Sequence, residues 1–320
     1  MKSINISGVT RLILRFKIEI ENHSNKAQNQ LKNLIDRELT ENDEIQYARL
    51  LIKKSEEIIL AHPNELVELG KRFDKIIGNE LMETKEKENF RKKIITCLGY
   101  SELRSNFYPK YFGKLGIKAC VYCNAQSTLS ITRSKLKPAL PPVIQGKFQV
   151  DHYMPKNNYP CFSISLFNLY PVCASCNNIK GTKKIDFLLY TNTTNKPYLE
   201  FELNKESHGK YLISRDIDDI KIEIKPLIIK PPKGYSDIIK LFEIGGIYEQ
   251  YKDIAEELIL KAEIYTPAYK NALLNSFSNY LKPEKIDRLI IGNYTLEDEI
   301  HKRPLSKFML DISKNIGLLK

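Results

Sequence analysis

The chain of 320 residues has no uninterrupted apolar run near the roughly 18–20 residues that a membrane-spanning helix needs. Its first residues are polar and interrupted by charge, unlike a secretory signal. Six cysteines are too few for a disulfide scaffold in a chain of this length. These absences argue against a membrane protein and against a small secreted domain. We therefore expect a cytoplasmic protein without membrane contact.

Acidic residues are nearly absent from one stretch. Residues 101–180 contain ten Lys or Arg and only two acids, Glu102 and Asp151, so this stretch carries +8 of the formal net charge of +11. Such an excess favours a polyanionic partner, because each phosphate that Lys or Arg neutralises releases condensed counterions. The alternative is a basic face that only keeps the protein soluble, but it does not explain why acids are missing from one stretch.

Hydropathy patterns predict an α+β fold that is mainly helical. Hydrophobic residues make up 42% of the chain, so a folded core in two or three units is expected. We expect a helical N-terminal region, a central module that carries the chemistry, and a small β-sheet followed by a helical C-terminal region, over residues 1–110, 111–190 and 191–320.

Several shorter segments give local expectations. Apolar and charged residues alternate over residues 12–21, which favours a strand in competition with a helix. Pro63 and Thr266–Pro267 are typical of helix starts. Residues 134–147 are rich in Pro and Lys and predict a loop, and the last twenty residues predict a basic surface helix with an apolar stripe. Short strands are expected at 199–203, 211–213 and 220–224.

Two C-x-x-C pairs are the most specific metal signal in the sequence. Four thiolates in two such pairs can close a tetrahedral zinc site that leaves no open position for chemistry. The pairs are 49 residues apart, more than the roughly 15–20 of a simple zinc ribbon, so an inserted segment is expected between them. The alternative is two unrelated pairs of buried cysteines. The predicted zinc ligands are Cys120, Cys123, Cys173 and Cys176, and the remaining Cys97 and Cys161 are expected to be ordinary buried thiols.

A second group of polar residues lies between and just after these pairs. Asp151 and His152 follow a β-like segment and are expected at the end of a strand, while Asn177 directly follows Cys176, where a helix is expected to begin. The imidazole of His152 suits a general base, because its ordinary pKa is near neutral. Asp151 and Asn177 offer hard oxygen ligands, which suit Mg²⁺ or Mn²⁺. Asn168, 16 positions after His152, is expected to accept a hydrogen bond from its ring.

Two lysines near these residues are candidates for phosphate contacts. Lys180 is expected on the same helix as Asn177, close to a bound phosphate. Lys156 follows Asp151 and His152 within the run D-H-x-x-P-K. For Lys156, a solvated lysine at a strand end is an equally good interpretation.

The string C-x-x-C, D-H-x-x-P-K, N-L and C-x-x-C-N-x-x-K resembles the HNH endonucleases, over about residues 118–184. The resemblance implies the ββα-metal fold, a structural Zn²⁺ on the four cysteines and a catalytic Mg²⁺ or Mn²⁺. It also implies hydrolysis of phosphodiester bonds in nucleic acid, with DNA favoured over RNA and the choice left open. It gives His152, Asp151, Asn168 and Asn177 the roles stated above. The third family residue is often His and is Asn177 here.

The long flanks add a second, broader resemblance. An HNH module with large helical surroundings looks like the HNH effectors of bacterial antiphage systems such as the Septu type, in which an ATPase accompanies the nuclease. Two alternatives remain open. One is a non-catalytic zinc-ribbon protein that binds nucleic acid, and the other is a protein-interaction scaffold. Asp151, His152, Asn168 and Asn177 distinguish them from a nuclease, because a ribbon that only binds has no use for these residues.

Overall fold

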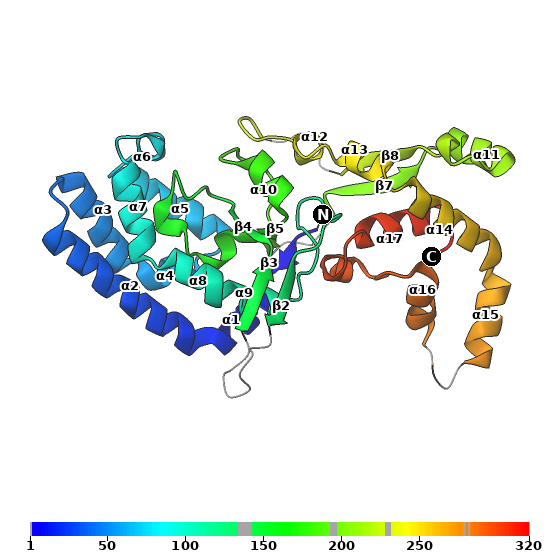
Figure 1. The fold of residues 1–320 in the computed structure, drawn as a ribbon, viewed down its shortest axis with the longest axis horizontal. Helices are drawn as coiled ribbons and strands as arrows, with labels where there is room; N and C mark the ends of the chain where they lie inside the picture. Colours follow the sequence, from blue (N-terminus) through cyan, green and yellow to red (C-terminus); the bar gives the residue numbers. More distant parts are fainter. Residues whose placement is uncertain are drawn as a thin grey trace.

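The computed structural model describes residues 2–133, 143–192, 197–227, 232–277, 280 and 282–319. Over these residues the fold is α+β and mainly helical, with four two-stranded sheets, so the expected fold class is confirmed. Figure 1 shows helices from the first third of the chain at one end, helices from the last third at the other, and strands between them. None of the helices in the described ranges is long and apolar enough to cross a membrane.

The N-terminal region is helical as far as Leu115. Its helices are α1 (Ile6–Ile13), α2 (Lys17–Arg37), α3 (Asn42–Lys53), α4 (Ser55–Leu60), α5 (Pro63–Asp74), α6 (Asn79–Glu83), α7 (Glu88–Cys97), α8 (Tyr100–Asn106) and α9 (Tyr108–Leu115). Pro63 occupies the first turn of α5, as its fixed φ favours. The amide of His62 donates to the Glu65 carboxylate at 2.7 Å and completes that helix start.

The strand expected at residues 12–21 is wrong. The segment contains the end of α1, a 3₁₀ turn at Leu14–Phe16 and the start of α2. The buried side chains are Ile6, Val9 and Ile13, which recur at helical spacing, whereas Leu14 and Ile18 are 64% and 74% exposed. The alternation of apolar and charged residues was real, but it did not match the pattern of burial.

The strands form four small sheets of two strands each. The pairs are β1 (Ile4–Asn5) with β6 (Tyr190–Thr191), which is parallel, and three antiparallel pairs: β2 (Leu129–Arg133) with β3 (Val143–Lys147), β4 (Gln149–His152) with β5 (Leu169–Val172), and β7 (Leu199–Leu203) with β8 (Ile222–Pro226). Part of the expected loop at 134–147 is therefore strand β3, and residues 134–142 lie outside the described residues. Helix α10 (Ala174–Lys180) follows β5 and packs against β4.

The C-terminal region combines the β7–β8 pair with helices. The helices are α11 (Lys205–Ser214), α12 (Ile238–Leu241), α13 (Ile244–Glu249), α14 (Lys252–Ile264), α15 (Pro267–Ser276), α16 (Pro283–Ile291) and α17 (Ser306–Asn315). Strands at 199–203 and near 220–224 are confirmed, but residues 211–213 lie in α11. Asn204 caps that helix by accepting from the Ser207 amide at 2.9 Å. Thr266 caps α15 in the same way, through the Tyr269 amide.

The last helix is a core element rather than a surface helix, which corrects the sequence expectation. Seven of its residues are buried, including Phe308, Leu310 and Ile312. It packs against β7 and α14, so its apolar stripe faces the interior of the C-terminal region. Its buried Lys307 is paired with Asp311 at 2.7 Å, which satisfies the charge inside the core.

Residues 300–307 also hold the first cysteine pair. Asn124, which follows Cys123, has the left-handed φ of 53° and donates from its side chain to the Ile300 carbonyl at 2.9 Å. Its side-chain oxygen accepts from the Lys307 amide at 3.0 Å. The Tyr248 hydroxyl donates to the Cys123 carbonyl at 2.7 Å. The C-terminal region therefore supports the segment that carries the first half of the cysteine cluster.

Candidate functional site

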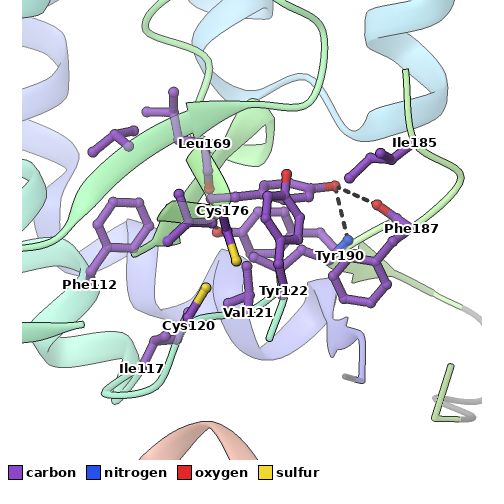
Figure 2. Close-up of a cluster of buried hydrophobic side chains, with 14 of the residues drawn as sticks. Phe112, Ile117, Cys120, Val121, Tyr122, Leu169, Cys176, Ile185, Phe187 and Tyr190 are labelled. Atoms are coloured by element: carbon purple, nitrogen blue, oxygen red, sulfur yellow. Dashed lines mark hydrogen bonds between the residues drawn. The ribbon is translucent and has the colours of Figure 1, made fainter. Parts of the chain in front are cut away.

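The four predicted cysteines form one buried cluster. Their sulfur atoms all lie within 4.8 Å of one another, and Figure 2 shows the sulfurs of Cys120 and Cys176 pointing toward each other. A tetrahedral zinc with Zn–S bonds of about 2.3 Å requires sulfurs roughly 3.8 Å apart, which this cluster can satisfy. The donors therefore fit a structural zinc, as expected. The remaining Cys161 is a buried thiol, while Cys97 is only partly buried.

The backbone around the cluster is already arranged to receive negative charge. The amide of Cys173 donates to the sulfur of Cys120 at 3.3 Å, and the amide of Cys176 donates to the sulfur of Cys173 at 3.5 Å. The four thiols differ: hydrogen bonds within the cluster lower the pKa of Cys173 and Cys123, whereas burial raises the pKa of Cys120 and hydrogen bonds from its neighbours raise the pKa of Cys176. The thiolate is the form of cysteine that binds metal, and the two backbone amides are donors that can stabilise it.

The hairpin β4–β5 and helix α10 bring the second group of residues together. Asp151 and His152 occupy the last two positions of β4, as expected, and pair with Tyr170 and Leu169 of β5. Asn177 lies within α10, one residue beyond the last cysteine. Asp151, His152, Asn177 and Lys156 all line one cavity of about 200 Å³. Four residues that lie up to 26 positions apart in the sequence therefore line the same cavity in the structure.

Asp151 is buried and is held by two groups that come from the cysteine pairs. The hydroxyl of Tyr122, which lies between Cys120 and Cys123, donates to Oδ2 of Asp151. The ammonium of Lys180, four residues after Cys176, lies 3.2 Å from Oδ1 and 3.1 Å from Oδ2. Burial raises the pKa of Asp151, and the charge of Lys180 opposes that rise. The carboxylate therefore depends on these two partners to remain ionised inside the protein.

His152 is held in the neutral form. Burial lowers its pKa to about 3, and the nearby positive charges of Lys156 and Lys180 act in the same direction. Its Nε2 lies 3.0 Å from the carbonyl oxygen of Ser163. Because a carbonyl can only accept, Nε2 carries the proton and Nδ1 keeps its lone pair. The free lone pair of the neutral ring is therefore on Nδ1.

The expected hydrogen bond between Asn168 and the His152 ring is not formed. Its side-chain oxygen accepts from the Met154 amide at 2.7 Å, and its nitrogen donates to the carbonyls of Met154 and Phe162 at 3.1 and 3.0 Å. Asn168 thus fixes the connection between β4 and β5. The carbonyl that orients the His152 ring belongs to Ser163 within this connection, so Asn168 acts on the histidine through the backbone. It does not line the cavity.

The two lysines have different environments. Lys180 is fully buried, and its ammonium also donates to the His152 carbonyl at 2.9 Å. The expected phosphate contact of Lys180 therefore disagrees with the structure, because a buried, fully paired ammonium has no access to a ligand. Lys156 lines the cavity with its ammonium 4.8 Å from the centre of the Tyr100 ring, so it remains a candidate for contact with an anion.

Tyr122, Ser163 and Tyr100 were not expected from the sequence. Tyr122 sits inside a C-x-x-C pair, where only the cysteines carry a recognisable pattern. Ser163 acts through its carbonyl, which any residue could supply. Tyr100 belongs to α8 in the N-terminal region, and its ring centre lies 5.3 Å from that of His152. Only the position of Tyr122 between two ligands could have suggested a role.

Comparison of the chain with protein-family models, with curated proteins and with solved structures finds no match in any of the three.

Proposed function

We propose that the protein is a metal-dependent endonuclease of the HNH type, which hydrolyses phosphodiester bonds in nucleic acid. One observation carries the proposal: Asp151, His152, Asn177 and Lys156 line a single cavity at the end of a β-hairpin and its following helix. The cysteine cluster sits at the base of the same hairpin and helix. This arrangement supports the interpretation of residues 118–184 as a ββα-metal module.

In the proposed reaction, His152 is the general base. Its Nδ1 takes a proton from a water molecule, whose oxygen then attacks the phosphorus atom of the scissile phosphodiester. The bond from phosphorus to the leaving 3′ oxygen breaks, and that oxygen takes up a proton from solvent water. Burial keeps the ring neutral, and Ser163 keeps the proton on Nε2, so no tautomer change is needed before the reaction. Lys156 places a positive charge at the cavity, where it can offset part of the phosphate charge.

Asp151 and Asn177 are the proposed ligands of a hard divalent cation. Asp151 and Asn177 supply a carboxylate and an amide oxygen to a cavity of about 200 Å³, and Mg²⁺ is commonly bound by one or two carboxylates, several waters and substrate phosphates. When bound, Mg²⁺ or Mn²⁺ stabilises negative charge on the phosphate and the leaving oxygen. Lys180 already faces both oxygens of Asp151, so we expect the cation to be held weakly until a phosphate adds its own ligands.

The substrate and biological role rest on resemblance and charge. The acid-poor stretch 101–180 supports a polyanionic substrate, and the HNH resemblance favours DNA over RNA. The HNH-like module with its large helical surroundings resembles the HNH effectors of bacterial antiphage systems, in which a partner ATPase accompanies the nuclease. An assay with plasmid DNA and tRNA, in Mg²⁺, Mn²⁺ or EDTA, tests the proposed activity and the choice between the two substrates.

A non-catalytic zinc-ribbon binder is the second candidate. The observation that favours it is the pairing of Asp151, since both of its oxygens already have partners in Tyr122 and Lys180. In that case Asp151 would only neutralise a buried lysine. The two candidates differ in whether the cavity needs a second metal.

Brief treatment with EDTA is expected to stop cleavage, and added Mg²⁺ or Mn²⁺ to restore it, with the zinc content unchanged. Oxygen ligands hold their ion far more weakly than four thiolates hold zinc, so the two metals should separate. Asp151→Asn should raise the Mg²⁺ concentration needed for half-maximal cleavage or abolish cleavage. Zinc is measured by elemental analysis, and the melting temperature reports whether Asn still accommodates the buried Lys180. Cleavage that persists in EDTA, or zinc release by Asp151→Asn, would contradict the proposed division of roles.

Tyr122→Phe is expected to raise the half-saturating Mg²⁺ concentration by about 10–100-fold, the usual cost of losing a group that orients a metal ligand. The substitution removes the hydroxyl that donates to Asp151 and keeps a ring that stacks on Phe242 at 4.9 Å. Tyr108→Phe is the matched control, because the Tyr108 hydroxyl is buried and has no hydrogen-bond partner among the described residues. Titration of cleavage with Mg²⁺, at unchanged zinc content, measures the effect. Equal Mg²⁺ dependence in the two variants would show that Tyr122 does not position Asp151.

A further inference from the structure

A larger groove adjoins the cavity of the candidate site. It has a volume of about 640 Å³ and lies between α8 and β3, which pack against each other. Val150 lines both the groove and the smaller cavity that contains Asp151 and His152, so the two are neighbours. Helix α8 belongs to the N-terminal region, outside the segment that resembles the HNH family. The groove is therefore built partly from a portion of the chain for which the resemblance gives no role.

The lining of the groove is polar and positively charged. Arg104 and Arg133 are both exposed there, and no Asp or Glu is among its described lining residues. The side chain of Arg133 has no hydrogen bond or ion pair among the described residues, and the side chain of Arg104 donates to the side-chain oxygen of Gln149. Within the described ranges, most of the donors on the two guanidinium groups therefore have no partner. Ser101, Asn106 and Gln145 add neutral polar groups along the same walls.

The positive potential of the groove extends to the candidate site. Burial lowers the pKa of Lys156, and the charge of Arg104 lowers it further. Arg104 is thus close enough to act electrostatically on a residue that lines the cavity. A polyanion that lies in the groove would have its next phosphate near His152 and Lys156.

We propose that this groove binds a single strand of nucleic acid, with Arg104 and Arg133 contacting phosphates next to the phosphodiester that is cleaved. The inference rests on the proposed nuclease function. A pocket of 300–1,000 Å³ typically holds a small-molecule ligand, so about 640 Å³ matches a few nucleotides of one strand, whereas a duplex would lie across the rim of the groove and not inside it. The partly buried ring of Phe148, which lines the groove, offers an apolar surface for a base.

The test measures binding without cleavage, in the His152→Ala background. A labelled single-stranded DNA of twelve nucleotides is titrated by fluorescence anisotropy at several salt concentrations. Adding the double substitution Arg104→Ala and Arg133→Ala to this background is expected to weaken binding about tenfold or more. It should reduce the slope of log K against log salt by about 1.4, because each phosphate contact with a single strand contributes about 0.7. A blunt duplex of the same sequence should bind more weakly and respond little to the pair.

Arg49→Ala is the matched control. Arg49 is exposed on α3, and Figure 1 shows α3 at the end of the N-terminal helices that is away from the strands. The loss of Arg49 changes the net charge without altering the groove, because Arg49 is not among its lining residues. It should leave the salt slope unchanged. An unchanged affinity and slope in the Arg104 and Arg133 pair would overturn the inference, as would a duplex that binds as well as the single strand with the same arginine dependence. Cleavage by the otherwise unaltered protein is scored separately, so a failure of the groove is distinguishable from a failure of the nuclease function.

Discussion

Replacing His152 with alanine is expected to slow phosphodiester cleavage by about 10²–10⁴-fold, the usual cost of losing a general base. Binding of nucleic acid should change little, because the groups proposed to hold phosphate are Lys156, Arg104 and Arg133. His152 is buried at the end of β4, and its Nε2 already donates to Ser163. No other described histidine lines the cavity, so the chain offers no second imidazole to take its place. Initial rates at saturating Mg²⁺, together with the affinity for an uncleaved oligonucleotide, measure the two effects.

Two controls separate chemistry from folding. His152→Gln keeps an amide donor at about the position of Nε2, facing the Ser163 carbonyl, and lacks a basic ring nitrogen, so it should be as inactive as alanine with better retained stability. His208→Ala, on α11 away from the cavity, should cleave at the normal rate. Because burial lowers the pKa of His152 to about 3, the wild-type protein should not lose its base between pH 7 and pH 5. Cleavage by His152→Ala at the wild-type rate would remove His152 from the mechanism.

Residues that belong to motifs with a fixed spacing could be predicted from the sequence to lie close together. The two C-x-x-C pairs are found together in one buried cluster, although 49 residues separate them. Asp151 and His152 lie at the end of a strand because the β-like segment before them pairs with residues 169–172. Asn177 shares α10 with Cys176, so ligand spacing and helix geometry place it near the hairpin. Local signals of this kind depend on few distant contacts.

Burial and distant partners could not be predicted in the same way. Lys180 and Lys156 look equivalent as basic residues near the motif, but only the packing of α10 on β4 decides that Lys180 is enclosed beside Asp151. Asn168 was correctly placed near the histidine, yet its short side chain is used by the backbone of Met154 and Phe162. The same reason explains why residues 12–21 and 211–213, which were expected to form strands, are helical in the structure. A short alternating run does not reveal which of its side chains the rest of the fold will cover.

Replacing Cys173 with serine is expected to remove stoichiometric zinc, to lower the melting temperature and to abolish cleavage together. A serine hydroxyl does not replace a thiolate on zinc, and the free energy of zinc binding is folding free energy, on the order of 10–16 kcal/mol in isolated zinc-binding peptides. The effect should be largest in the central hairpin and α10, which are small and have the cluster at their base. Elemental analysis measures the zinc content. Hydrogen exchange of residues 118–133 and 143–184 measures the loss of local stability.

Cys97→Ser is the control, because Cys97 is partly buried on α7 and lies outside the cluster, so zinc content and cleavage should be retained. The coupling of the cluster to activity follows from two side chains. Tyr122 extends from the first cysteine pair and Lys180 from the helix of the second, and both bond to Asp151. Loss of zinc therefore removes both partners of the carboxylate at once, and added Mg²⁺ should not rescue the variant. A Cys173→Ser protein that lacks zinc but cleaves normally would show that the cluster neither folds the hairpin nor positions Asp151.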